Sequence, residues 1–66
     1  MANFEKRKDA WLKANEGRPN TQKLIRFAYD HPKLLINKKG DPRFDMVEAL
    51  VYGRVFRDRG TRIVRP

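Results

Sequence analysis

The sequence predicts a small, mainly α-helical single domain, on three grounds. Apolar residues recur at helical spacing in separate stretches, each bounded by glycine, proline or a capping residue. The 66 residues leave room for one hydrophobic core. The chain has no cysteine, so neither a disulfide framework nor a thiolate metal site can stabilise it. We therefore expect one compact domain over residues 1–66, a bundle of about three helices whose ends fray.

The first helix is expected over about residues 3–15. Asn3 can cap its N-terminus, and Gly17 can end it in the left-handed conformation. Phe4 and Trp11 fall on one line of the helix surface at about 100° per residue. We expect this helix to pack mainly through these two aromatic side chains.

The second helix is expected over about residues 21–30, capped by Asn20 or Thr21. Pro32 disfavours helical geometry at His31 and so helps to end it. Helical spacing predicts an apolar face of Leu24, Ile25, Phe27 and Ala28, and an opposite, mainly basic face of Gln22, Lys23, Arg26 and Asp30.

The next stretch contains a run of three apolar residues, Leu34, Leu35 and Ile36, which is too short for periodicity to assign. It fits a buried strand, and it fits equally a short helix opened by Pro32 and closed at Gly40. In either case we expect the three apolar side chains to be largely buried.

A last helix is expected to start at Asp41 and Pro42, because a carboxylate can cap a helix and proline needs no donor at the first position. Its apolar positions are Phe44, Val47, Leu50 and Val51.

Beyond Gly53 two alternatives remain. The helix can continue to Arg59, which turns Tyr52 and Phe56 outward. Alternatively it stops near Gly53, and residues 54–65 form a short β-hairpin with Gly60 in a left-handed turn position. The sequence slightly favours the mainly helical form.

Catalysis is not expected. The chain has neither serine nor cysteine as a nucleophile. His31 and Asp30 are adjacent, and neighbouring helical side chains point about 100° apart, so they do not form a dyad. Asp45 and Glu48 fit a solvated acidic pair at a helix start better than a metal site. We predict a protein that is not an enzyme and binds no metal or cofactor.

No apolar run approaches the roughly 20 residues of a membrane span, and the chain is charged from Glu5 onward, which argues against a signal peptide. We therefore expect no membrane partner and a cytoplasmic location. Few apolar residues remain for a pocket, so a small-molecule substrate is not expected either.

The charge predicts an anionic partner. Sixteen lysines and arginines face eight acidic residues, for a formal charge of +8. The excess is uneven, since residues 17–40 carry six basic groups and one acidic group. The last fourteen residues carry five arginines and one aspartate. Nucleic acid, DNA or RNA, is the first candidate, and an acidic protein surface is the second.

The leading hypothesis is a small nucleic-acid-binding protein that contacts backbone phosphates with low sequence specificity. Arginine is suited to two-pronged phosphate contacts. Asn20 and Gln22 can reach base edges. Four aromatic residues can stack on bases, although Trp11 is expected mainly in the core: Tyr29, Tyr52, Phe56 and Trp11. The candidate phosphate-binding residues are Arg18, Lys23, Arg26, Lys33, Lys38, Lys39, Arg54, Arg57, Arg59, Arg62 and Arg65.

The alternative hypothesis is a small non-enzymatic regulator or inhibitor that binds a larger protein, such as a nucleic-acid-processing enzyme. Tyrosine, phenylalanine and arginine are enriched at the centres of protein interfaces. Tyr52, Phe56 and Arg57 are the candidate anchors, because a continuous last helix turns the two aromatic rings outward.

Overall fold

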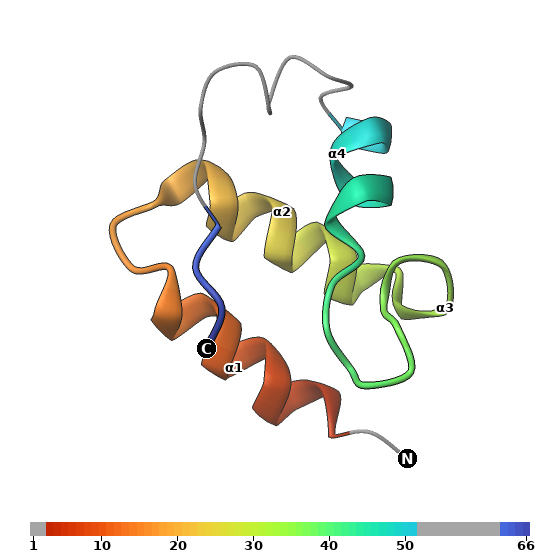
Figure 1. Ribbon diagram of the computed structural model, residues 1–66, viewed down its shortest axis with the longest axis horizontal. Helices are drawn as coiled ribbons and strands as arrows, with labels where there is room; N and C mark the ends of the chain where they lie inside the picture. Colours follow the sequence, from red (N-terminus) through yellow and green to blue (C-terminus); the bar gives the residue numbers. More distant parts are fainter. Residues whose placement is uncertain (1–2, 52–62) are drawn as a thin grey trace.

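The computed structural model describes residues 3–51 and 63–66. Within this part the fold is mainly helical, with no sheet. Figure 1 shows α2 lying between α1 and α4, and α2 packs against each of the other three helices. The helices are α1 (Phe4–Ala14), α2 (Pro19–Asp30), α3 (Pro32–Leu35) and α4 (Phe44–Val51).

The local signals that bound α1 are confirmed. The Asn3 side chain accepts a hydrogen bond from the Lys6 amide at 3.2 Å. Gly17 adopts a φ of 78°, where a residue without a Cβ carries no steric penalty. Trp11 is buried with 2% of its surface exposed, whereas Phe4 is 37% exposed and meets Tyr29 edge-on. The helix therefore packs through Trp11 more than through Phe4.

The start of α2 differs from the prediction. The helix begins at Pro19, and its N-cap is Arg18, which makes no side-chain cap hydrogen bond. Proline suits this first position because its φ is preset and its missing N–H would have no helical partner there. Thr21, expected as a cap, lies inside the helix and is fully buried. The end of α2 at Asp30, just before Pro32, is confirmed.

The ambiguous third segment forms the short helix and no strand, and this helix ends at Leu35 and not at Gly40. Pro32 opens α3, a single turn, and Ile36 then pairs with Pro42 in one antiparallel bridge. Leu35 and Ile36 are buried as expected. Leu34 is 49% exposed, so its predicted burial is wrong. Adjacent residues of a helix point about 100° apart, and in α3 it is Leu35 that lies in the core cluster with residues of α2 and α4.

The predicted cap of α4 is also wrong, since the helix begins at Phe44. Asp41 is instead a hydrogen-bond acceptor for two side chains of α1, and Pro42 is held in its bridge. The amide of Arg43 donates to the Leu35 carbonyl at 2.7 Å, and the Arg43 carbonyl accepts the first helical bonds of α4. Tertiary partners thus occupy both residues that the local pattern assigned to the helix start.

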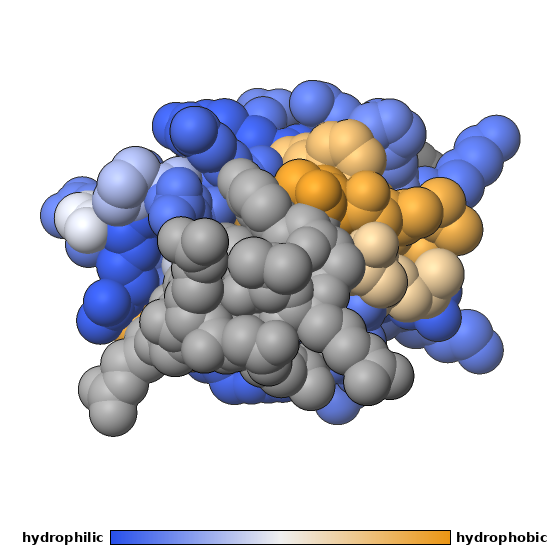
Figure 2. Space-filling model, turned by 90° about the horizontal axis from the view of Figure 1, so that it is seen from above, coloured by the Kyte–Doolittle hydropathy of each residue, from blue (hydrophilic) through white to orange (hydrophobic). Residues whose placement is uncertain are grey.

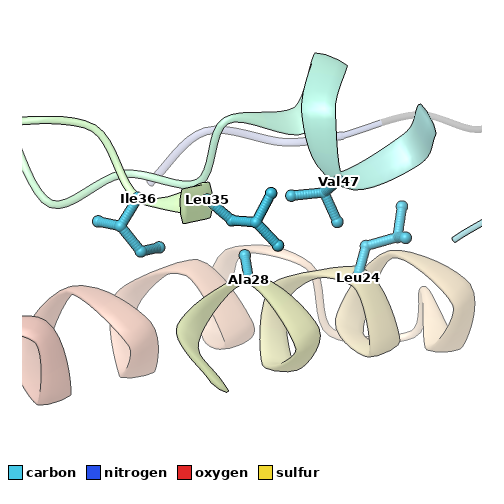
Figure 3. Packing of buried hydrophobic residues seen from close by; sticks show 5 residues of the cluster. All are labelled: Leu24, Ala28, Leu35, Ile36 and Val47. Carbon is cyan, nitrogen blue, oxygen red and sulfur yellow. The ribbon is translucent and has the colours of Figure 1, made fainter. Parts of the chain in front are cut away.

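The core lies where α2, α3 and α4 meet (Figure 3). Val47 is the one fully buried apolar residue of α4, and Phe44 is half-buried. Leu50 is 57% exposed and Val51 39% exposed, so their predicted burial is wrong. The central cluster consists of Leu24, Ala28, Leu35, Ile36 and Val47.

The alternatives for the last part of the chain fall mostly on residues 52–62, which lie outside the described residues. Residues 63–65, the end of the hypothetical hairpin, form no strand. They lie instead against the C-terminal part of α1 (Figure 1). There the Asn15 side chain bonds both backbone groups of Val64.

Candidate nucleic-acid interface

The outer face of α2 presents two basic side chains one turn apart. Lys23 and Arg26 are exposed, opposite the buried Leu24 and Ala28. Their placement on the solvent side confirms the amphipathic pattern read from the sequence. Asp30 is exposed on the same face and reduces the positive potential at the end of the helix.

Gln22 does not belong to this face, although the helical pattern placed it there. Its side chain is half-buried, and its amide nitrogen donates to the Leu12 carbonyl of α1 at 3.1 Å. It therefore ties α2 to α1 and is not free to contact a base edge. Asn20, the other candidate for base contact, is exposed.

Three more exposed basic side chains follow α2 along the chain. Lys33 is exposed on α3, and Lys38 and Lys39 are exposed on the turn that follows. That turn is held by Asn37, whose side-chain oxygen accepts from the amides of Lys39 at 2.9 Å and Asp41 at 3.0 Å. The two lysines thus project from a turn with a fixed backbone. We call Lys23, Arg26, Lys33, Lys38 and Lys39 the basic surface.

The positive charges of the basic surface are not neutralised by described carboxylates. Between described residues the structure has one ion pair, which joins Arg7 to Asp41. None of the five members of the basic surface takes part in it. Arg18, the remaining candidate of this region, is half-buried at the start of α2.

The arginine-rich end of the chain was expected to form a second basic stripe. Arg54, Arg57, Arg59 and Arg62 lie outside the described residues. Arg65 is exposed, and its guanidinium carbon lies 6.0 Å from the centre of the Trp11 ring. The interface candidates Tyr52, Phe56 and Arg57 also lie outside the described residues.

A buried carboxylate links α1 to the loop before α4, and the sequence pattern gave no sign of it. Asp41 accepts hydrogen bonds from the Arg7 guanidinium and from the Trp11 indole, the latter at 3.0 Å. Burial alone would raise the pKa of Asp41, but the hydrogen bonds from Arg7 and Trp11 outweigh it and hold this pKa below its usual value. These residues lie 30 or more positions apart along the chain.

Tyr29 is engaged inside the fold and is not available for stacking on bases. Its hydroxyl donates to the Gly40 carbonyl at 2.5 Å, and its ring meets Phe4 with centroids 6.3 Å apart. Burial, reinforced by the nearby charge of Asp41, raises the pKa of Tyr29 to about 12. Tyr29 therefore fastens the lysine-bearing turn to α2.

Of the residues considered for catalysis or metal binding, His31 contacts other residues of the fold and Glu48 is buried. The Nδ1 atom of His31 lies 2.9 Å from the Phe27 carbonyl, and the His31 and Phe27 rings lie with centroids 4.5 Å apart and planes tilted by 40°. Asp45 is exposed, but Glu48 is only 6% exposed, so a solvated pair is wrong for Glu48. In residues 3–51 and 63–66, no three potential ligand side chains gather as a metal site would require.

None of the helices in the described part of the chain has the length and apolar content needed to cross a bilayer. Comparisons with protein-family models, with curated proteins and with solved structures found no match to this chain.

Proposed function

We propose that this chain is a small nucleic-acid-binding protein that contacts backbone phosphates with low sequence specificity. The observation that carries the proposal is the basic surface, whose five exposed cations have no ion-pair partner among the described residues. A polyanion supplies the counter-charge that the described residues do not provide there.

The chemistry of the basic surface favours phosphate over base contacts. Four of its five members are lysines, which act as compact point charges and carry little directional information. Each phosphate that a cation neutralises releases counterions, and this release drives binding to any sequence. Gln22, one of two side chains with amide groups suited to bases, is already bonded to α1.

The direct test measures the affinity for random duplex and single-stranded DNA and RNA at 50 and 200 mM salt. A surface that neutralises about five phosphates loses a few hundredfold in affinity over this range, because the logarithm of the binding constant falls by about 0.9 per phosphate for each tenfold rise in salt. Absence of binding to all four polymers at 50 mM would refute the proposal.

A matched pair of variants locates the interface. Lys23→Gln with Arg26→Gln removes two charges from α2, and Lys6→Gln with Lys13→Gln removes two exposed charges from α1. The α2 variant should bind more weakly and lower the salt slope by about 2, whereas the α1 variant should leave that slope near the wild-type value. Equal losses in both variants would show that total charge, not the basic surface, governs binding.

A second function has one observation in its favour, the exposure of Leu50 and Val51 at the end of α4. Figure 2 shows an apolar patch beside the atoms drawn in grey. Such a patch fits a regulator that binds a larger protein. Under this hypothesis Tyr52→Ala with Phe56→Ala abolishes capture of a partner from a nuclease-treated extract while the circular dichroism spectrum is unchanged. Capture that disappears with nuclease treatment alone would favour nucleic acid.

A further inference from the structure

Residues 63–66 lie against the C-terminal part of α1, far in sequence from the helix that they contact (Figure 1). The contact centres on Asn15, which is fully buried. Its side-chain nitrogen donates to the Val64 carbonyl at 2.8 Å, and its side-chain oxygen accepts from the Val64 amide at 2.8 Å. The same nitrogen also donates to the Trp11 carbonyl, at 2.9 Å. Asn15 is thereby held in place by its own helix while it binds the segment.

This pairing recognises backbone and not a particular side chain. A carboxamide that binds the N–H and the C=O of one residue reproduces the two-bond exchange between paired residues of antiparallel strands. Any residue other than proline has the N–H and the C=O that these two hydrogen bonds need at the position of Val64. Selectivity comes from the next residue, because the Arg65 guanidinium lies over the Trp11 ring at 6.0 Å.

The contact between the segment and α1 is small. Ile63 and Val64 are half-buried, Arg65 is exposed, and no regular secondary structure extends the pairing. The polar contacts of this segment are two hydrogen bonds between the Asn15 side chain and the Val64 backbone, and the cation–π contact of Arg65 with Trp11. The charge of Arg65 also lies close enough to Asp41 to help lower the pKa of that carboxyl.

We propose that Asn15 and Trp11 form a binding site for an extended peptide segment in which arginine follows an apolar residue. Residues 63–66 occupy this site as a reversible ligand, and the same segment of a second copy of the chain can replace them. Departure of the segment takes away two of the three hydrogen bonds of the buried Asn15 carboxamide, which is costly, so the site favours an occupied state from either source.

The test uses the full chain with its own segment weakened. Val64→Pro removes the N–H that Asn15 binds, and Arg65→Ala removes the cation over Trp11. The probe is a synthetic peptide with the wild-type sequence of residues 61–66, which stands for the segment of a second copy. Binding is followed by the fluorescence of Trp11, the one tryptophan of the chain.

We expect the doubly substituted chain to bind the probe at least tenfold more tightly than the wild-type chain does. In the wild-type chain the tethered segment competes at an effective concentration on the order of millimolar. A control peptide carrying the same two substitutions should not bind. In a nitrogen-labelled sample of the doubly substituted chain, the side-chain amide resonance of Asn15 should shift when the wild-type peptide is added.

Equal affinity of the two chains for the wild-type peptide would overturn the proposal, and so would binding of the control peptide. Absence of binding to the substituted chain would overturn it as well. A substituted chain that has lost its helical circular dichroism would show that residues 63–66 are a permanent part of the fold, which contradicts a reversible ligand.

Discussion

At the scale of single residues, a few polar side chains hold segments together that are far apart in sequence. Asp41 joins α1 to the loop before α4, Asn15 joins α1 to Val64, and Tyr29 joins α2 to the turn at Gly40. Each polar group is bonded where it is removed from water, so its burial does not destabilise the fold.

Replacement of Asp41 by asparagine should lower the free energy of unfolding by about 1–2 kcal/mol, because a hydrogen bond to a charged group is worth more than one to a neutral group. The Arg7 side chain is 42% exposed, and solvent screening keeps the loss modest. Urea unfolding followed by Trp11 fluorescence measures it. Asp9→Asn, at an exposed site on the same helix as Arg7, is the control and should change little.

The same carboxylate predicts acid sensitivity. Burial opposes the charge of Asp41, but the bonds from Arg7 and Trp11 prevail and place its folded pKa below the ordinary value of 3.8. The unfolded chain therefore binds more protons between these two pKa values, and stability falls as pH drops from about 4 through the folded pKa. Acid titration of the wild type and of Asp41→Asn should give a shallower fall in the variant. Identical curves would show that Asp41 does not contribute.

Tyr29 predicts a loss of stability at alkaline pH. Its folded pKa is raised to about 12, mainly by burial. Its contribution to stability is complete below the unfolded value of about 10 and is lost as pH rises through about 12, because the unfolded chain releases the proton first. Tyr29→Phe should reduce the loss of stability over this range, as measured by urea unfolding at a series of alkaline pH values. An unchanged alkaline profile would contradict the assignment.

At the scale of elements, each helix buries one side, and the short ones bury very little. α2 has two full sides, an apolar one in the core and a basic one in solvent. α3 is a single turn that buries Leu35 and leaves Leu34 half-exposed. The two neighbouring leucines of α3 should therefore differ sharply in their contribution to the free energy of unfolding.

The pair Leu34 and Leu35 tests this difference. Leu35→Ala should cost about 2–5 kcal/mol, because the residue is fully buried and its removal leaves a cavity. Leu34→Ala should cost less than about 1 kcal/mol, since about half of its surface is already in water. For a chain of 66 residues the first loss is comparable with the whole stability, on the order of 3–10 kcal/mol. Thermal unfolding of both variants compares them, and equal effects would contradict the packing of α3.

At the scale of the whole molecule, the excess of positive charge opposes folding. The formal charge is +8, and one ion pair joins described residues. Salt screens the repulsion among exposed cations over distances of about 10 Å at 0.1 M. The charge that attracts a polyanion thus lowers the stability of the free protein.

Thermal unfolding should therefore shift to higher temperature as sodium chloride rises from low concentration to about 0.15 M, where most of the screening is complete. The chain with Lys23→Gln and Arg26→Gln, whose formal charge is lower by two, should show a smaller shift. Its melting temperature at low salt should equal or exceed that of the wild type. A wild-type melting temperature that does not rise with salt would contradict the idea that repulsion is significant.

The sequence by itself determined the helical class, the bounds of α1, the end of α2 and, apart from Gln22, the two sides of α2. These features depend on short-range signals: Asn3 and Gly17 act within their own turn, Pro32 acts on its neighbour, and the apolar spacing of α2 has a single solution. The charge that motivates a polyanion partner is likewise a property of composition.

Only the tertiary structure decided which partners the polar side chains bind and which apolar residues of the short helices are buried. The sequence around Asp41 predicts a helix cap, but in the structure this carboxylate binds Arg7 and Trp11. The sequence around Asn15 does not indicate its partner Val64, which lies 49 positions away. A polar side chain can form its hydrogen bonds with neighbours in sequence or with residues far away in sequence, and the local sequence pattern contains no information about the distant partners. The burial of Leu35 over Leu34, and the exposure of Leu50, follow for the same reason from which neighbours the assembled helices bring together.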